Sequence, residues 1–271
     1  MSSVVRTEYP DLSTRFTKNE TFVSGDSLEI NTRTDQKVIV EVQESTSPVT
    51  IVAGPLNDTL IGGDSELGDD TISGGDGTDI IEGRAGDDQL SGGDGNDDIV
   101  GGAGNDDIVG GAGNDTMVGG DGDDVLEIEA GDAVAGGLGA DTFRLDLSQP
   151  YDASNAPIIT DLESGGDKIS ISGQGDGAFS YDMATGLLLY NGQSILKLDG
   201  NVALSAENLT DSTGSSNIPL EVVPVVYKLS GTVYNDTNEP DQNMIEDTDT
   251  PIAGVEVKLF AADGTTVINT A

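Results

Sequence analysis

The sequence contains no histidine, no cysteine and no tryptophan, and only 4% of its 271 residues are aromatic. Without cysteine there is no disulfide to stabilise the fold, and without cysteine and histidine a zinc site is not expected. Large aromatic side chains usually dominate a conventional core, so one large core is not expected. These absences leave metal ions as the expected means of stabilising the chain outside the cell.

Catalysis is not expected from this composition. Residues Gly25-Asp26-Ser27-Leu28 spell the motif of GDSL hydrolases, but that chemistry requires a histidine base. Metalloprotease chemistry of the H-E-x-x-H type is excluded for the same reason. A glycosidase with two carboxylates is not excluded by residue type, yet coincidental pairs are inevitable among 50 acidic residues. We therefore expect a protein that is not an enzyme.

Positive charge is also scarce, with 11 basic residues against 50 acidic ones and a net charge of −39. This excess of negative charge argues against binding to nucleic acid and to anionic membranes. No apolar stretch approaches the length of a membrane-spanning helix, so no membrane span is expected. Residues 1–16 have no apolar segment typical of a cleaved signal peptide. Between Gly62 and Phe143 there are 22 acids and one base, Arg84, which indicates a segment that needs cations.

That acidic segment is an internal repeat with a step of nine residues. The unit GGDGNDDIV, which begins at Gly92, is representative. The sixth position is always Asp and the eighth is always apolar, as in Asp97 and Ile99. Six units follow without slippage, beginning at Gly74, Gly83, Gly92, Gly101, Gly110 and Gly119. Imperfect units flank them, as expected for the ends of a stack.

Each unit predicts a turn followed by a short strand, so that two consecutive units form one coil. Sixth-position aspartates that lie two units apart should then stack on the same side. One side is expected to carry Asp70, Asp88, Asp106, Asp124 and Asp141, and the other Asp58, Asp79, Asp97 and Asp115. The apolar residues should form a thin core in which Ile81, Ile99 and Met117 face Ile72, Leu90, Ile108, Leu126 and Phe143.

The turn chemistry predicts calcium sites. Glycine allows φ > 0 and lets a tight turn aim carbonyl oxygens inward, and the sixth-position Asp adds a carboxylate. Ca²⁺ takes six to eight such oxygen ligands, whereas Mg²⁺ demands a stricter octahedron. The predicted carboxylate ligands are the nine aspartates of the two series, and the predicted carbonyl ligands are those of Gly74, Gly83, Gly92, Gly101, Gly110 and Gly119. The variable acids, Asp76, Asp94, Asp98, Asp107 and Asp121, are expected to face solvent.

These units resemble the repeats-in-toxin (RTX) nonapeptide G-G-x-G-x-D-x-U-x, a Ca²⁺-binding β-helix repeat. The resemblance covers residues 53–144. It implies an all-β, right-handed parallel β-roll that folds on binding about six to eight Ca²⁺ ions. It also implies a secreted protein that is exported by type I secretion machinery.

The flanks are expected to be rich in β-structure. We expect residues 1–52 to form an N-terminal cap and residues 145–209 to form strands that flank the repeats. Residues 210–226 are expected to be a polar linker. Residues 227–271 resemble the B-repeat of Sdr-type surface adhesins, which implies an incomplete β-sandwich and a second Ca²⁺ site. The candidate ligands there are Asp236, Asn238, Asp241, Glu246, Asp247 and Asp249.

Two functions fit the sequence best, and a third, a calcium store or surface-layer component, would show ordered self-assembly when Ca²⁺ is added. The first is a calcium-binding structural or adhesive module at the cell surface or in the extracellular medium, with a partner on a cell surface or in the matrix. The alternative is the secretion and folding appendage of a larger secreted enzyme or toxin. Domains encoded beside this chain would discriminate between them, since further β modules indicate an adhesin and a catalytic domain indicates an appendage.

Overall fold

The computed structural model describes residues 39–42 and 48–223 in full, apart from gaps at 65–67, 152–153, 164–165, 176, 200–201, 203 and 216–217. It describes only the backbone of Val38 and of the strands at 14–18, 28–31, 234–235, 250–251, 258–260 and 267–270. Every regular element in these residues is a β-strand. None of the described segments is a helix with the length and hydropathy needed to cross a membrane.

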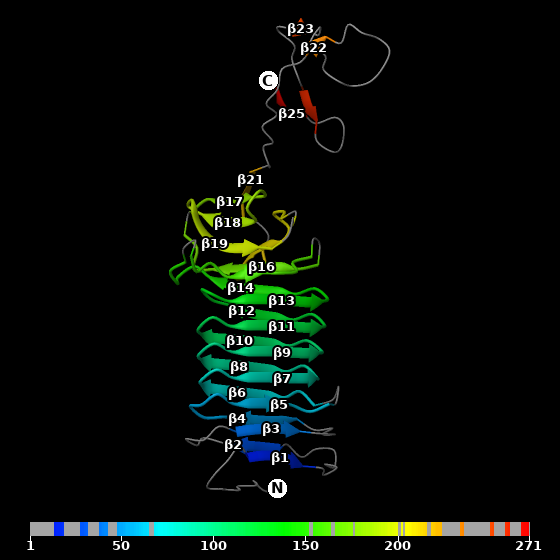
Figure 1. The fold of residues 1–271 in the computed structure, drawn as a ribbon, viewed down its shortest axis with the longest axis vertical. Coiled ribbons are helices and arrows are strands. Elements are labelled where there is room, and N and C mark those ends of the chain that lie inside the picture. The colour runs from blue at the N-terminus through cyan, green and yellow to red at the C-terminus, as the bar shows by residue number, and fades with distance from the viewer. Residues whose placement is uncertain are drawn as a thin grey trace. The chain divides into compact units, whose positions relative to one another are not determined.

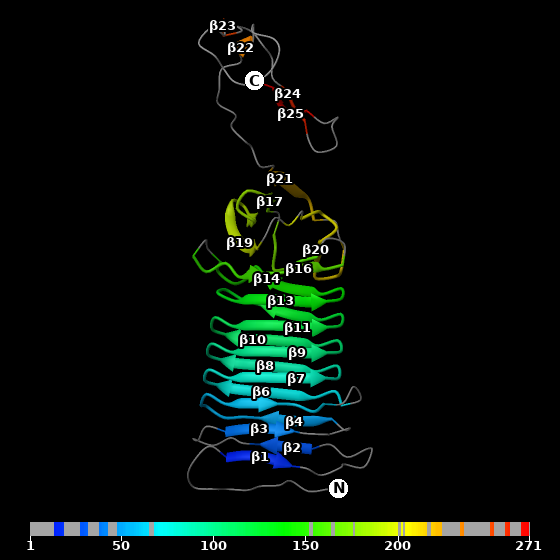
Figure 2. The ribbon, with the colours of Figure 1, turned by 45° about the vertical axis from the view of Figure 1, so that its right-hand side comes forward.

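Two large sheets make up the first compact unit, residues 1–225. Up to residue 172, successive strands alternate between the two sheets along the chain, whereas the three strands between residues 179 and 198 all belong to the first sheet (Figures 1 and 2). The first sheet contains β1 (Thr14–Lys18), β3 (Val38–Val42), β5 (Thr59–Ile61), β7 (Ile80–Ala85), β9 (Asp98–Ala103), β11 (Thr116–Asp121), β13 (Ala133–Leu138), β15 (Ile158–Ile159), β19 (Gln193–Leu198), β18 (Leu187–Tyr190), β17 (Phe179–Asp182) and β21 (Leu220–Val223). The second contains β2 (Leu28–Asn31), β4 (Val49–Val52), β6 (Thr71–Asp76), β8 (Gln89–Asp94), β10 (Asp107–Ala112), β12 (Val125–Ile128), β14 (Thr142–Asp146), β16 (Lys168–Ser172) and β20 (Leu209–Asp211).

The nonapeptide step explains this topology. One unit provides one strand and one turn, and the chain then reverses into the opposite sheet. Strands two units apart pair in parallel, with Ile81 opposite Ile99 in the first sheet and Leu90 opposite Ile108 in the second. The predicted parallel β-roll, with two units in each coil, is therefore confirmed.

The core is a narrow double row of aliphatic side chains between the two sheets. It forms because the eighth position of each unit points inward while its neighbours in the strand point outward, which is the period of two expected in a strand. The eighth-position side chains are at most 2% exposed, and the predicted members are all present: Ile81, Ile99 and Met117 from the first sheet, and Ile72, Leu90, Ile108, Leu126 and Phe143 from the second. Such a core is too thin for many aromatic rings.

The N-terminal strands extend the two sheets of the roll below the repeats. β3 pairs in parallel with β5, with Val40 opposite Leu60, and β4 pairs with β6, with Ile51 opposite Ile72. Val40, Leu60 and Ile51 are fully buried. Strands β3 and β4 therefore contribute rungs without the nonapeptide sequence, because β-branched residues in alternation suffice to form a strand with one buried face.

At the other end, parallel stacking changes into antiparallel pairing. β17, β18 and β19 pair antiparallel, whereas β16 still pairs in parallel with β20. Tyr181 is fully buried and donates its hydroxyl proton to the carbonyl of Val202. Larger side chains thus close the roll where the repeats end.

Residues 210–226, which the sequence indicates as a polar linker, contribute to two strands of this end. β20 extends to Asp211 and β21 pairs in parallel with β17. The amide groups of Thr213 and Ser215 donate to the Asp211 carboxylate, so polar residues here form a turn between strands. Polar composition alone does not distinguish such a turn from a linker.

The second compact unit comprises residues 226–271. Its described strands are β22 (Tyr234–Asn235), β23 (Thr250–Pro251), β24 (Lys258–Phe260) and β25 (Val267–Thr270). β22 pairs antiparallel with β23, and β24 pairs antiparallel with β25.

Candidate metal centre

The sixth-position aspartates form two continuous hydrogen-bonded series. Within a series, the backbone N–H of each Asp donates to Oδ1 of the Asp one coil later, as from Asp88 to Asp106 at 2.8 Å. One series is Asp70, Asp88, Asp106, Asp124, Asp141 and Asp167, and the other is Asp58, Asp79, Asp97, Asp115 and Asp132. The two predicted stacks are confirmed, and each is one residue longer than the sequence indicated.

These aspartates are fixed at three points. Every member of the two series except Asp167 also uses its carbonyl to accept the N–H that opens the strand one coil later, as from Asp107 to Asp88 at 2.8 Å. All members are at most 2% exposed. One coil therefore places the carboxylate of the next with little freedom, which is the preorganisation that a metal site requires.

The second carboxylate oxygen has no hydrogen-bond partner in most of these residues. Within the part of the chain that the structure describes, Oδ2 is buried without a hydrogen-bond donor in Asp88, Asp97, Asp106, Asp115, Asp124 and Asp141. Burying an ionised oxygen in this way is costly unless a cation or a donor compensates it. Six repeated cases make these oxygens the candidate ligands of a cation.

Glycine creates the space in which these oxygens lie. A Cβ atom at Gly101 would lie 2.2 Å from Asp106 Oδ2 and 2.6 Å from the carbonyl oxygen of Gly119. At the fourth position, Gly104 has φ +128° and its Cβ would lie 2.0 Å from the carbonyl oxygen of Gly86 in the previous coil. Any side chain would collide with the oxygens of the turn, so glycine is required both for φ and for space.

Burial raises the pKa of several of these carboxyl groups, among them Asp106. It raises the pKa of Asp106 to about 7, although the hydrogen bond from the Asp88 backbone acts in the opposite direction, and the neighbouring charges of Asp88 and Asp124 raise it further. Burial likewise raises the pKa to about 6 in Asp88, Asp115, Asp124 and Asp132. The ionised state of these stacked carboxyl groups is therefore unfavourable near neutral pH unless a positive charge lies beside them.

The donor set suits Ca²⁺. Each turn offers carboxylate oxygens from stacked aspartates and carbonyl oxygens from glycines, and these hard oxygens are the ligands that Ca²⁺ takes in flexible geometry. In the described residues no three acidic or histidine side chains gather closely enough to hold a metal by themselves. A metal ion in these turns would therefore need main-chain carbonyls as well, and the first-position glycine carbonyls are suitably placed, as Gly119 shows beside Asp106.

Asp132 and Asp167 were missed in the sequence because their units do not keep the nine-residue step. Asp132 lies 17 residues after Asp115, and Asp167 lies 26 residues after Asp141. Their Oδ2 atoms accept the N–H groups of Glu129 and Glu163, respectively. A search for Asp immediately before an alternating strand, without a fixed step, would have found both.

The remaining predicted positions divide into two groups. The variable acids Asp76, Asp94, Asp98, Asp107 and Asp121 are exposed, as expected. The candidates in the adhesin-like segment, Asp236, Asn238, Asp241, Glu246, Asp247 and Asp249, lie outside the described residues.

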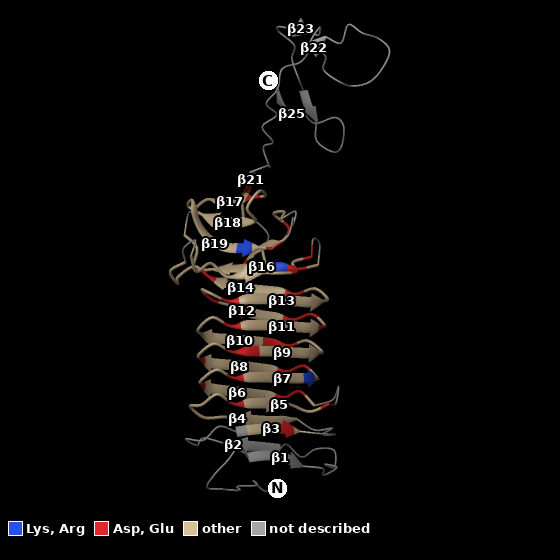
Figure 3. Cartoon of the chain, viewed as in Figure 1, with Lys and Arg blue, Asp and Glu red and all other residues tan. Residues whose placement is uncertain are grey.

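Acidic residues concentrate in the turns along the roll, whereas Lys and Arg are sparse (Figure 3). Arg144 lies 3.7 Å from Asp107 in an exposed pair, which is expected to contribute little to stability. The electrostatic field of the turns therefore favours small cations.

The fifth position forms a second, exposed row that the sequence did not reveal. The N–H of Asn105 donates to Asp87 Oδ1 at 2.7 Å, and the N–H of Asp123 donates to Asn105 Oδ1 at 2.8 Å. The direction is opposite to that of the buried row, since here the later residue donates to the earlier one. Asn and Asp are frequent at this position because their side-chain oxygen accepts the backbone N–H of the turn one coil later.

Replacing Asn105 with Ala is expected to lower the free energy of unfolding by about 0.5–1 kcal/mol, the usual net contribution of one hydrogen bond. The N–H of Asp123 would lose its protein acceptor but remain accessible to water. Urea denaturation in saturating Ca²⁺ measures the change. Asn105→Asp keeps the acceptor and is the matched control, so equal losses in both variants would contradict the assignment.

Comparison with known proteins identifies the repeat. The family model "RTX calcium-binding nonapeptide repeat (4 copies)" matches residues 52–90, 65–99 and 91–126. No curated protein matches the chain. Among solved structures, the solution structure of the AlgE6R3 subunit from the Azotobacter vinelandii mannuronan C5-epimerase is 25% identical and covers 57% of this chain and 94% of that one, with a TM-score of 0.34. Residues 52–126 of this chain therefore belong to the RTX calcium-binding nonapeptide repeats and form part of a Ca²⁺-binding parallel β-roll.

Proposed function

We propose that this chain is a secreted structural or adhesive module whose β-roll folds when it binds extracellular Ca²⁺. The observation that carries the proposal is the row of buried Oδ2 atoms in Asp88, Asp97, Asp106, Asp115, Asp124 and Asp141, which have no hydrogen-bond donor among the described residues. The ions would lie between stacked turns, where the sixth-position carboxylates and the first-position glycine carbonyls hold them. Bound calcium would supply the positive charge that the row lacks.

The extracellular location follows from ion availability. Weak extracellular Ca²⁺ modules have Kd values of about 10⁻⁴–10⁻³ M, so the sites would fill outside the cell and remain empty at cytosolic calcium. The absence of cysteine and the net charge of −39 fit a chain that relies on cations for its stability. Export by type I secretion machinery is part of this proposal and is supported by the resemblance of the repeats.

The adhesive role rests on the second compact unit. Its sequence resembles the B-repeats of surface adhesins, and its described strands pair antiparallel. We include no catalytic role, because the chain has no histidine and no cysteine. The roll would act as a stiff support, since every coil is hydrogen-bonded to the next.

Isothermal titration calorimetry with CaCl₂ tests the proposal through its stoichiometry. We expect about six to eight ions per chain with Kd values near 10⁻⁴ M, because the two series offer several gaps between stacked turns. A titration with MgCl₂ is the control and should give a much weaker signal, since Mg²⁺ loses its water reluctantly. Binding of one ion or none would contradict the proposal.

A further inference from the structure

Arg84 breaks the pattern of the repeats in two ways. It is the only Lys or Arg between Gly62 and Phe143, and it takes the second position of its unit, where the other five complete units have glycine. Its φ is +83°, in the region that side chains avoid. A strained residue of this kind persists only where its surroundings compensate for the strain.

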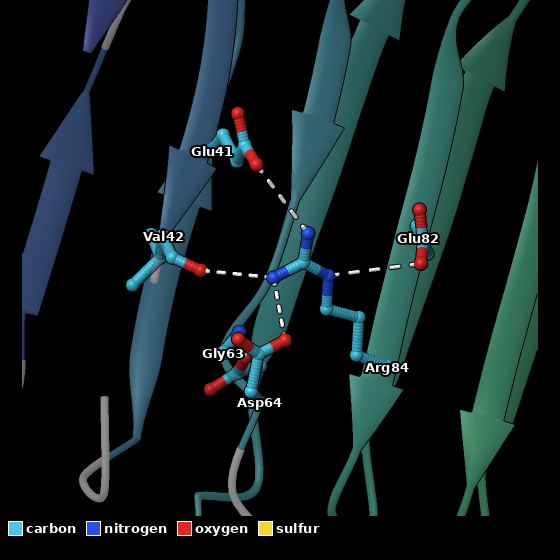
Figure 4. Close-up of polar contacts among 7 residues, drawn as sticks. Glu41, Val42, Gly63, Asp64, Glu82 and Arg84 are labelled. Atoms are coloured by element: carbon cyan, nitrogen blue, oxygen red, sulfur yellow. Dashed lines mark hydrogen bonds and ion pairs between the residues drawn. The ribbon is translucent and has the colours of Figure 1, made fainter. Parts of the chain in front are cut away.

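The surroundings of the Arg84 guanidinium consist of oxygens from lower rungs and from its own strand (Figure 4). Its Nη1 atom lies 2.6 Å from Asp64 Oδ1 and donates to the Val42 carbonyl at 3.3 Å. Glu41 contributes a carboxylate oxygen 3.6 Å from Nη2, and Glu82 contributes one 3.6 Å from Nε. Three carboxylates and one backbone carbonyl thus surround a side chain that is only 20% exposed, and this donor set is the kind that Ca²⁺ takes in the coils above.

The buried aspartates of this coil and of the coil below it differ in the hydrogen bonds of the second carboxylate oxygen. In the coil below, Asp70 Oδ1 accepts the N–H of Val49 and Asp70 Oδ2 accepts the N–H of Gly63 at 2.6 Å. In the coil of Arg84 itself, Asp88 Oδ2 is buried and lacks a donor among the described residues. The need for a cation therefore begins at the coil of Arg84, on this side of the roll.

We propose that the Arg84 guanidinium is a fixed cation that takes the place of calcium at this rung. The N-terminal coils, from β3 to β7, then close without a metal ion, and the calcium-dependent coils stack on them. The inference rests on the proposed function for the coils above Arg84. The metal-free coils would give the roll an ordered end, and folding could propagate from this end when calcium binds, as nearest-neighbour stacking in repeat proteins allows.

The proposal is tested by hydrogen exchange of the full chain in EGTA, measured at the backbone amides of β3 and β5. We expect protection in the wild-type protein and a roughly tenfold loss in Arg84→Gln, because three carboxylates would then face one another without a cation. Arg144→Gln is the matched control: it removes the same charge from an exposed pair and should leave this protection unchanged. Equal protection in the wild-type protein and Arg84→Gln would overturn the proposal.

Arg84→Gly separates the cation from the backbone strain. It restores the glycine of the repeat and relieves φ, so a merely structural role predicts equal or higher protection in EGTA. Our proposal predicts a loss, followed by recovery in millimolar Ca²⁺ with one more ion bound than in the wild-type protein. Unchanged or higher protection of Arg84→Gly in EGTA would therefore also overturn the proposal.

These readouts separate failure of this inference from failure of the proposed function. If calcium does not order the coils above Arg84 in any variant, the proposed function fails, whereas the comparison in EGTA still reports on the guanidinium. If calcium orders those coils in all variants but protection of β3 and β5 in EGTA does not depend on Arg84, only the inference fails.

Discussion

Adding millimolar Ca²⁺ to this protein in EGTA is expected to produce a large gain in the β-sheet signal of circular dichroism. With about eight sites of Kd near 10⁻⁴ M, each would add roughly 1.4 kcal/mol at ~1 mM Ca²⁺, or about 11 kcal/mol in total. That sum is comparable to the whole stability of a typical domain, about 5–15 kcal/mol. Calcium alone can thus decide whether the repeats above Arg84 are folded.

The gain should depend on the identity of the ion and not on ionic strength. Sodium chloride screens the repulsion among the acidic residues, but it does not place a tightly bound cation beside Asp88, Asp106 and Asp124. Magnesium should act weakly because it prefers strict octahedral geometry. The same spectrum in excess EGTA as in calcium, or equal responses to sodium and calcium, would contradict calcium-dependent folding.

Replacing Asp106 with Asn is expected to have opposite effects with and without calcium. In saturating Ca²⁺ at pH 8 we expect the free energy of unfolding to fall by about 1–3 kcal/mol, since the central turns lose a charged ligand. The Asn oxygen can still accept the N–H of Asp88, so the hydrogen-bonded series is kept. Asp107→Asn is the matched control. Asp107 is the next residue and is exposed, so this variant removes the same charge without changing the buried row.

Without calcium, the sign follows from the raised pKa of Asp106. Burial raises this pKa from 3.8 to about 7 in the folded protein, so the folded state retains a proton that the unfolded state releases above about pH 4. The contribution of this group to folding is therefore fully present below about pH 4 and is lost as the pH rises to about 7. In EGTA at pH 8, Asp106→Asn should be more stable than the wild-type protein, because it avoids the buried charge.

The β-sheet signal of circular dichroism in EGTA measures this effect. The variant should keep a larger folded fraction than the wild-type protein at pH 8, and the difference should vanish near pH 4. Calcium affinity should decrease over the same range of pH, since protonated carboxylates are poor ligands. If Asp106→Asn is destabilised in EGTA at pH 8 as much as in calcium, Asp106 has a role in packing and not in binding a cation.

Most of the central roll could be read from the sequence because its information is local and periodic. Nine-residue units with Asp97 or Asp106 at the sixth position and Ile99 or Ile108 at the eighth specify turn, strand and inward face in each unit. Repetition then fixes the register, with strands two units apart in contact, without any long-range information.

The ends of the roll were less predictable, because they follow tertiary packing instead of a motif. Asp132 and Asp167 join the two series at separations of 17 and 26 residues. The strands before residue 53 continue both sheets, and part of the apparent linker forms β20 and β21. In each case a strand pairs with the exposed edge of an adjacent coil, which offers unpaired backbone groups to any chain that can reach it.

The sequence by itself determined the repeat, the calcium chemistry and the order of the stacked aspartates. Only the tertiary structure decided which carboxylate oxygens need a cation. Asp70 and Asp88 occupy the same position in their units, yet the N–H of Gly63 satisfies one Oδ2 while the other has no donor among the described residues. The donor to Asp70 lies in its own turn, where Gly63 and Asp70 are seven residues apart instead of the four of a regular unit. The contacts of Arg84 with Asp64 and Glu41 form only where the coils stack, and the repeat does not encode them.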